Sequence, residues 1–335
     1  MRQPVPIHFY LPKEYWPASG IPTSIDGSQT YFLNTALNWV LQTYLRLRDA
    51  GYSVELTADL PAEGVIVSFS GLVPFEFIPN ARQYFVSISA DAPAHPFANM
   101  HIVQNMRQSK RLRNAHFVPH WPQPLLIPRD TMRGARFEHA VYYGDEVNLA
   151  AELRTQAWRD SLTNLGLTWI IRGDASPLKA SFVDVDVIVA VRSFHKAGFV
   201  RKPASKLFNA WIAGVPAILG VEFAFQEQRK SQWDYIEVHS VEETLEAIRR
   251  LAASPELRNR MIENGKLRAE EVTVPAITER WRAVLFDSAV VGYQNWIEGG
   301  ALGKSLHYAR CIRDKKVRGI HHRTLKRLGQ EHNSI

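Results

Sequence analysis

The sequence predicts an α/β protein of two domains, each a parallel β-sheet with helices packed on it. The chain has 335 residues, which is long for a single core and suits two domains of about 150 residues. Apolar runs of strand length alternate with amphipathic helical segments in both halves, which is the pattern of βαβ units. Hydrophobic residues make up 46% of the chain, enough for two packed cores and too much for general disorder.

The first half opens with a βαβ unit. A strand is predicted at Val5–Leu11, and a polar loop follows at Gly20–Thr30. A helix is predicted at Tyr31–Ala50; Gly51 closes it, and Tyr52–Thr57 alternates like a strand. The apolar face of this helix comprises Leu33, Leu37, Val40, Leu41, Tyr44, Leu45 and Leu47.

Two continuous apolar runs, Gly64–Ser70 and Gln83–Ala90, predict buried parallel strands. Asp91 and His95 follow the second run, ahead of a short strand at Ile102–Val103. Open α/β sheets bind ligands just past the carboxyl ends of their strands, so either side chain is a candidate base toward a hydroxyl substrate. The other interpretation is a proline-rich surface turn. The histidine spacing here fits no metal-ligand pattern, and we predict no metal site.

A proline-rich segment, Val118–Asp130, divides the chain, as expected of a domain join. The sheet pattern then starts again. Strands are predicted at Ala140–Tyr143, at Thr168–Ile171 and at Val183–Val191, the last of these central, and a helix is predicted at Leu149–Leu165. The Asp184-Val185-Asp186 run lies inside a predicted strand, so we interpret it as structural.

A basic loop, Arg192–Lys206, follows the predicted central strand. Its cations would repel one another unless an anion lies among them; the alternative is a solvated basic loop. They are Arg192, Lys196, Arg201, Lys202 and Lys206, with His195 between them.

The loop leads into the stretch Arg201–Gly220. Ser205 is predicted to cap a helix, Gly214 to end it, and Ala217–Leu219 to form a buried strand. A helix N-terminus offers free N–H groups, and lysines beside it add positive charge, a combination that suits a diphosphate. The alternative is that this stretch is an ordinary αβ unit of a parallel sheet with no role in binding a diphosphate. Beyond it we predict a strand at Tyr235–Val238 and helices at Val241–Ala253 and Pro255–Glu271. The caps are predicted to be Ser240, paired with Glu243 in a capping box, and Ser254.

The stretch Arg201–Gly220 resembles the nucleotide-sugar-binding segment of GT-B-fold glycosyltransferases, in particular the glycogen-synthase/mannosyltransferase-like group. Asn209 stands where that family has a glutamate that hydrogen-bonds the donor ribose. Many members also carry an Arg and a Lys after the first strand of the second domain. Here that place reads GDEVNL (Gly144–Leu149), which leaves Lys196, Lys202 or Lys206 to supply the charge. The matching residues are Ser205, Lys206, Leu207, Phe208, Ala213, Gly214, Pro216 and Ile218.

The resemblance implies two Rossmann-like domains that face each other across a cleft, with a C-terminal helix that crosses back to the first domain. The domains would be residues 1–128 on the acceptor side, 129–285 for the nucleotide sugar, and 286–335 as C-terminal helices and a basic tail. The implied activity is a metal-independent glycosyltransferase that moves a sugar from a nucleotide-diphosphate donor, such as a UDP- or GDP-sugar, to an acceptor hydroxyl, with no cofactor. A catalytically inactive GT-B-like protein that binds a ligand or partner is the alternative.

Two groups of residues are expected to bind the acceptor and the donor of this transfer. Gly20–Asp26, Asp91 and His95 would serve the acceptor, with the last two as catalytic candidates. The donor site would comprise Arg192, Lys196, Lys202, Ser205, Lys206 and Asn209.

The net charge of +7 belongs entirely to the tail after Gly303, which carries nine Lys or Arg against Asp314 and Glu331. The tail is interpreted as a solvated helix, as a contact with an anionic membrane surface, or as a nucleic-acid contact. For a transferase the membrane interpretation is favoured over nucleic acid. A single cysteine, Cys311, excludes a disulfide within the chain. With no signal peptide or spanning segment evident, we expect a cytoplasmic protein, peripheral to the membrane if the tail binds it.

Overall fold

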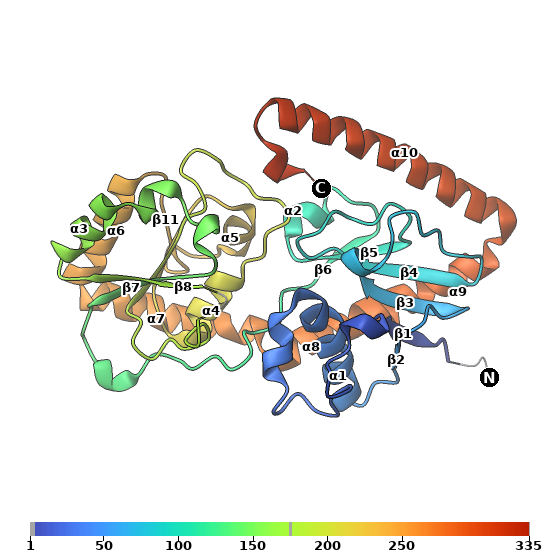
Figure 1. The fold of residues 1–335 in the computed structure, drawn as a ribbon, viewed down its shortest axis with the longest axis horizontal. Helices are drawn as coiled ribbons and strands as arrows, with labels where there is room; N and C mark the ends of the chain where they lie inside the picture. Colours follow the sequence, from blue (N-terminus) through green and yellow to red (C-terminus); the bar gives the residue numbers. More distant parts are fainter. Residues whose placement is uncertain (1–3, 174–175, 335) are drawn as a thin grey trace. The chain divides into compact units, whose positions relative to one another are not determined.

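The computed structural model describes residues 4–173 and 176–334, and the chain divides into two compact units. Unit 1 comprises Met1–Trp121, Val200–Pro203 and Val274–Ile335; unit 2 comprises Pro122–Phe199 and Ala204–Thr273. Each unit holds one parallel sheet with helices, so the predicted α/β class is confirmed (Figure 1). The chain first passes from unit 1 to unit 2 inside the proline-rich segment. The domain boundaries at residues 128 and 285 concern parts of the chain that fold independently, and they remain predictions.

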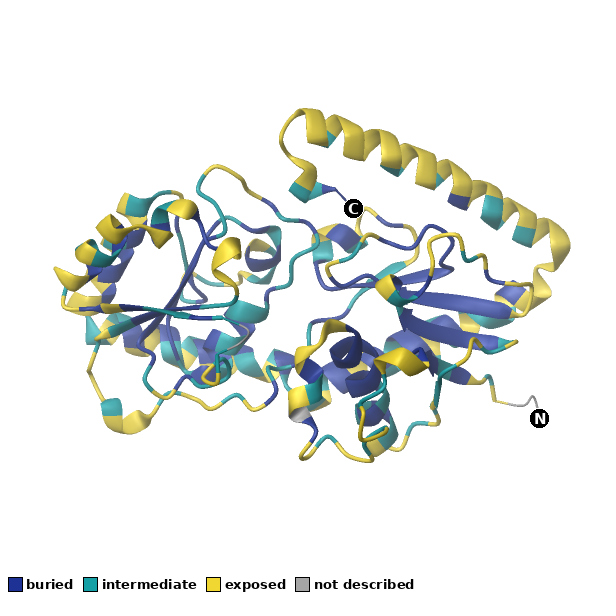
Figure 2. Cartoon of the chain, in the orientation of Figure 1, coloured by how far each residue is buried: buried dark blue, intermediate teal, exposed yellow. Residues whose placement is uncertain are grey.

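The sheet of unit 1 has six parallel strands in the order β2-β1-β3-β4-β5-β6. All of β4 is buried, and so is β3 except for its last residue, because parallel strands are covered on both faces (Figure 2). The sequence analysis missed β6, which has only three half-buried residues at the sheet edge. The strands are β1 (Ile7–Tyr10), β2 (Glu55–Thr57), β3 (Gly64–Phe69), β4 (Gln83–Ile88), β5 (Met100–Val103) and β6 (Ala115–Phe117).

The sheet of unit 2 has five parallel strands in the order β11-β10-β9-β7-β8. The predicted central strand is confirmed as β9, although it is shorter than Val183–Val191. The carboxylates of Asp184 and Asp186 accept from the side chains of Arg172 and Arg133, and the strand starts after them. The strands are β7 (His139–Tyr143), β8 (Thr168–Arg172), β9 (Val187–Ala190), β10 (Ala217–Leu219) and β11 (Ile236–Glu237).

The C-terminal helices belong to unit 1, which confirms the predicted return of the chain. The rings of Trp281 in α8 and Trp39 lie 6.4 Å apart at their centroids, and both side chains are fully buried. In α9, Gly292 lies against Tyr84 of β4 so closely that an added Cβ would stand 2.6 Å from the ring Cζ atom. The helices of this unit are α1 (Gln42–Asp49), α2 (Met106–Ser109), α8 (Val274–Arg282), α9 (Val290–Glu298) and α10 (Gly300–Arg327).

The helix predicted at Tyr31–Ala50 begins later than expected. The side chain of Asn34 accepts hydrogen bonds from the backbone N–H groups of Ala36 and Leu37, at 2.9 and 3.3 Å, so it separates a 3-10 turn from the helix. The helix then runs through a π-helical turn, Leu37–Leu41, into α1. Leu33 lies before this break and is 41% exposed, so its assignment to the apolar face was wrong. Gly51 ends the helix at φ 85°, as predicted.

In unit 2, two helices begin at the caps predicted for them, and one bond of the predicted capping box has a different partner. The Ser240 and Ser254 hydroxyls accept hydrogen bonds from the N–H groups of Glu243 and Leu257, both at 3.1 Å. The Glu243 carboxylate accepts from the N–H of His239, one residue before the expected partner. The helices are α3 (Gln156–Thr163), α4 (Ser205–Ala213), α5 (Phe223–Gln228), α6 (Val241–Ala253) and α7 (Pro255–Ala269).

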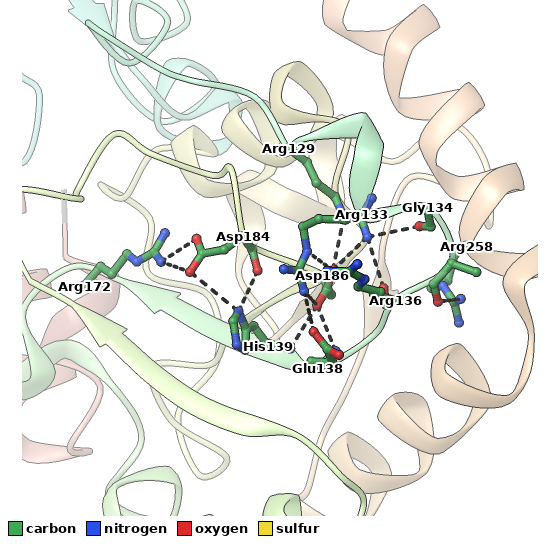
Figure 3. Close-up of polar contacts among 11 residues, drawn as sticks. Arg129, Arg133, Gly134, Arg136, Glu138, His139, Arg172, Asp184, Asp186 and Arg258 are labelled. Carbon is green, nitrogen blue, oxygen red and sulfur yellow. Dashed lines mark hydrogen bonds and ion pairs between the residues drawn. The ribbon is translucent and has the colours of Figure 1, made fainter.

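Asp186 lies just before β9 and is the centre of a buried ionic network (Figure 3). Its side chain is fully buried, and the carboxylate accepts bonds from the guanidinium groups of Arg129 and Arg133 at 2.7–3.2 Å. It also accepts from the N–H groups of Glu138 and His139 at 2.8 and 3.0 Å. Both carboxylate oxygens of Asp184, two residues earlier, accept from the Nη2 atom of the buried Arg172, at 2.6 and 2.7 Å. These contacts support the structural interpretation of the two aspartates.

No helix in residues 4–173 and 176–334 combines the length and the apolar character needed to cross a bilayer. Within the same residues, no group of three His, Cys, Asp or Glu side chains is placed to hold a metal ion.

Candidate functional site

The strand order of unit 2 marks the place where a ligand would bind. The first strand, β7, pairs with β8 on one side and with β9 on the other. Such a reversal is a topological switch point, and open parallel sheets bind ligands outside the carboxyl ends of the strands there. The residues of interest are therefore those that follow Tyr143 and Ala190.

Gly144 follows β7 and leaves room for a cation. Its φ of 122° is a conformation that residues with a side chain rarely adopt. A Cβ placed on it would lie 3.3 Å from the Tyr142 hydroxyl and 3.6 Å from the Lys206 Nζ atom. Lys206 comes from the first turn of α4, and its ammonium also lies 5.4 Å from the centroid of the Tyr142 ring. The sequence analysis offered Lys196, Lys202 or Lys206 as the cation for the segment Gly144–Leu149, which has no Lys or Arg. Of these three, Lys206 lies beside that segment.

The N-terminus of α4 has no side-chain cap. Ala204 occupies the N-cap position, and Ser205 is already the first helical residue, so the prediction that Ser205 caps the helix was wrong. The first N–H groups of a helix carry partial positive charge, although in α4 the Leu207 N–H already donates to the Ala204 carbonyl oxygen at 3.0 Å. The uncapped start of α4 therefore combines these groups with the charge of Lys206. At the other end, Gly214 adopts φ 68° and ends the helix as predicted.

Carboxylates of the protein already pair with several cations of the basic loop. The Arg192 Nε atom lies 3.2 Å from Oε2 of Glu222, whose side chain is 3% exposed, and an Arg192 Nη1 bond at 3.4 Å reaches Asn148. His195 pairs with Glu152 at 2.9 Å. Carboxylates from outside the loop therefore supply part of the negative charge that the sequence argument assigned to an external anion. Sequence reasoning gave Glu222 no role, although an acidic residue three positions after the end of the strand β10 is a signal at this sheet edge.

Lys196 and Asn209 occupy less informative positions. Lys196 is exposed, and its backbone N–H donates to the Ser193 hydroxyl at 3.0 Å, which shapes the loop rather than directing the ammonium. Asn209 is half-buried in α4, one turn after Ser205.

In unit 1, Asp91 lies past the carboxyl end of β4 in a fixed position. Its Oδ1 atom accepts from the Gln104 side chain at 2.7 Å, and its Oδ2 atom lies 2.9 Å from the Lys202 Nζ atom. Gln104 and Asn105, which follow β5, also donate to the backbone carbonyls of Arg201 and Lys202 at 3.0 and 3.1 Å. The Asp91 side chain is 51% exposed. The segment that carries Lys202 is thus fastened to the same sheet edge as Asp91, and this lysine pairs with the protein itself.

His95 is a core residue. It is completely buried, its Nε2 atom lies 2.9 Å from the Pro74 carbonyl oxygen, and its Nδ1 atom accepts from the Phe97 N–H at 3.3 Å. The ring also stacks on Phe75, with 5.8 Å between centroids. Burial lowers its pKa. Both ring nitrogens are occupied by backbone groups, so the structure keeps His95 and Asp91 in different environments and offers no free nitrogen to a substrate.

No family model and no curated protein matches this sequence. Among solved structures, sucrose-phosphate synthase from Thermosynechococcus elongatus matches with a TM-score of 0.54 at 13% identity, over 85% of this chain and 99% of that chain. The chain has the GT-B fold.

Two further solved structures resemble this GT-B chain less closely. AviGT4, a glycosyltransferase involved in avilamycin A biosynthesis, has a TM-score of 0.49 at 14% identity, over 89% of this chain and 99% of its own. Anabaena HepE in complex with UDP has a TM-score of 0.49 at 11% identity, over 84% of this chain and 100% of its own.

The Gly144→Ala substitution tests whether the bare backbone at the switch point of this GT-B chain is required. The positive φ and the close Tyr142 hydroxyl and Lys206 ammonium predict a loss of about 1–3 kcal/mol in the free energy of unfolding. Chemical denaturation measures this loss. Gly173→Ala, at the end of β8, is the matched control, because the nearest atoms to a Cβ there lie at 3.9 Å and its φ is outside the positive range. Equal stability of both variants and the wild type would contradict the expectation.

Proposed function

We propose that this protein is a glycosyltransferase that moves a sugar from a nucleotide-diphosphate donor to an acceptor hydroxyl. The proposal is supported by the GT-B fold, shared with a structure whose name is sucrose-phosphate synthase. The observation that carries it is the meeting of Lys206, the uncapped start of α4 and the bare backbone of Gly144 at the switch point of unit 2.

In this proposal the donor diphosphate lies at the start of α4. The N–H groups of the first turn and the Lys206 ammonium would offset the negative charge that develops on the leaving diphosphate as the glycosidic bond breaks. This role needs no metal ion, because the cation and the helix terminus supply the positive charge. Asn209, one turn along the helix, would offer its amide to the ribose hydroxyls. Arg192 would act through its ion pair with Glu222, which fixes the loop after β9.

On the acceptor side we propose Asp91 rather than His95. The Asp91 carboxylate is half exposed and held in place by Gln104 and Lys202, whereas His95 has no free ring nitrogen. A positioned carboxylate past the end of a parallel strand can accept a proton from an acceptor hydroxyl.

A catalytically inactive GT-B-like binding protein is the second candidate. Two observations favour it. Asn209 replaces the glutamate that the resemblance leads one to expect, and Arg192 is paired with a buried carboxylate instead of standing ready for a phosphate.

We also propose that α10 contacts an anionic membrane surface. Its exposed residues Leu302, Leu306 and Ile320 lie on one side of the helix by the 3.6-residue period, and they are 74%, 48% and 57% exposed. Arg313 and Lys316 are exposed beside them, and most of α10 is exposed (Figure 2). Apolar side chains flanked by cations are typical of helices that lie in the lipid interface.

A panel of nucleotide sugars tests the proposed activity and separates it from the alternative. We expect at least one UDP- or GDP-sugar to raise the melting temperature, because a ligand that binds only the native state stabilises it. We also expect slow release of free sugar from that donor without an acceptor. Binding without any release, in long incubations with candidate acceptors present, identifies an inert binding protein. If no nucleotide sugar shifts the melting temperature, the proposed transferase activity fails, and a GT-B-like protein that binds a different ligand or a partner remains.

A further inference from the structure

Unit 1 contains a cavity at the edge of its sheet opposite to Asp91. The cavity has a volume of about 670 Å³ and is lined by residues of β4 and β5, of the segments that precede β5 and β6, and of α9 and α10. Tyr84 and His101 are second in their strands, and Asn99 and Asn114 directly precede β5 and β6. These are the amino ends of the strands, whereas Asp91 and Gln104 follow the carboxyl ends. The cavity is therefore separate from the proposed catalytic residues, and its size falls in the range of small-molecule sites, roughly 300–1,000 Å³.

The charged wall of the cavity is strongly cationic. Arg111, Arg113, Arg313 and Arg318 line it, and Asp314 is the acidic residue among its lining side chains. Asp314 is shared, since it pairs with Arg113 at 2.6 Å and with Arg313 at 3.0 Å. His101 adds nothing to this positive charge, because burial lowers its pKa to about 3 and leaves the ring neutral.

Arg318 is a partly buried cation of this wall that has no carboxylate partner in the part of the chain that the structure describes, whereas Arg111 is exposed to solvent. Its Nη1 atom donates to the Ala94 carbonyl oxygen at 3.5 Å, and no carboxylate in the described residues lies within 4.0 Å of its guanidinium. Burial lowers the pKa of Arg318, although its side chain remains charged. A partly buried charge that makes one long hydrogen bond is unfavourable in the absence of a partner. An anion in the cavity would supply one.

Another part of the wall is apolar and borders open space. Leu112, Trp296 and the buried Cys311 contribute apolar surface. Gly303 of α10 also lines the cavity, and a Cβ placed there would meet no atom within 4 Å. The site thus offers cations at Arg113 and Arg318 and, beside them, unfilled space bounded by apolar groups.

From this arrangement we infer that the cavity binds an amphiphilic anion, a phosphate or carboxylate head on Arg318 and Arg113 with an apolar chain against Leu112 and Trp296. The inference does not depend on the proposed transferase activity. The same chemistry could reach the cavity as a free amphiphile or as a membrane lipid, and the experiment distinguishes these sources.

The first arm of the test measures binding of decyl phosphate to the full chain by calorimetry, below the concentration at which the amphiphile forms micelles. We expect decyl phosphate to bind at least about tenfold more tightly than inorganic phosphate or decyl maltoside, because only the first carries both a charge and a chain. Arg318→Met is expected to lower the affinity about 10–100-fold. Its melting temperature without ligand should be unchanged or higher, whereas a structural role for Arg318 predicts a lower one.

The second arm fills the cavity. Gly303→Leu places a side chain in the open space and is expected to abolish binding of decyl phosphate, while helix propensity keeps α10 folded. Gly319→Leu is the matched control: it lies on the same helix, also meets no atom within 4 Å, and does not line the cavity, so binding should be retained.

The third arm identifies the source of the amphiphile. Co-sedimentation with phosphatidic-acid vesicles that falls in Arg318→Met and Gly303→Leu indicates a membrane lipid, and unchanged co-sedimentation with loss of decyl phosphate binding indicates a free amphiphile. The inference is overturned if the wild type does not bind decyl phosphate, or if both variants bind it as the wild type does.

Discussion

Replacing Asp186 by alanine is expected to lower the free energy of unfolding by about 3–5 kcal/mol, the cost of breaking a buried ion pair by removing one partner. The substitution leaves Arg129 and Arg133 next to each other without their shared carboxylate, and two backbone N–H groups lose their acceptor. This is a large part of the roughly 5–15 kcal/mol that stabilises a typical domain. Urea denaturation followed by fluorescence measures the loss.

Asp160→Ala is the matched control, because Asp160 is an exposed residue of α3 that accepts one bond from Gln156. We expect its effect to stay within about 0.5 kcal/mol. Should Asp186→Ala not accumulate as folded protein, Asp186→Asn preserves the shape and allows the measurement. A loss below about 1 kcal/mol in both Asp186 variants would show that the network contributes little.

The same network gives the protein a defined acid sensitivity. Burial by itself would raise the pKa of Asp186, but hydrogen bonds from Arg133, from the Glu138 backbone, from Arg129 and from the His139 backbone together hold the pKa below its ordinary value. The unfolded chain therefore binds this proton more readily than the folded one. The contribution is complete above the ordinary carboxyl pKa of about 3.9 and is lost as pH falls through the lowered value. In Asp186→Asn this part of the acid dependence should disappear.

Lys206→Ala is expected to reduce the affinity for a nucleotide diphosphate about 10–100-fold, the effect of losing one hydrogen bond to a charged group. The lysine stands beside Gly144 at the switch point, where a diphosphate at the start of α4 would meet it. Calorimetric titration with UDP and GDP measures the change. Transfer or hydrolysis should fall at least as much as affinity, because the charge on the leaving diphosphate grows as the bond breaks.

Lys266→Ala serves as the control, since this lysine lies on the exposed side of α7 and pairs with Glu263. Asn209→Ala extends the test to the ribose. Unchanged UDP and GDP affinity in both the Lys206 and the Asn209 variants would remove the assigned donor site while leaving the fold assignment intact.

Local patterns determined much of the fold. Continuous apolar runs predicted β3 and β4, and Gly51 and Gly214 ended their helices at positive φ as predicted, because few other residues adopt that conformation. Ser240 and Ser254 cap their helices as predicted because a hydroxyl and an N–H three residues later meet without help from the rest of the chain. The hydrophobic pattern misplaced the start of the helix predicted at Tyr31–Ala50, because the Asn34 side chain bonds to the Ala36 backbone N–H and interrupts the helix there.

The site depended on contacts between distant residues. The sequence alone identified a basic loop before a helix. It also offered three lysines, Lys196, Lys202 and Lys206, as sources of the positive charge that the segment Gly144–Leu149 lacks. Only the folded sheet shows that Lys206 stands beside Gly144, that Lys202 pairs with Asp91, and that His95 is buried. The reason is physical. Hydrophobic periodicity and backbone conformational preference depend on residues that are close in sequence. The partner of a charged side chain depends on the order of the strands in the sheet, which brings together residues such as Asp91 and Lys202, more than a hundred positions apart.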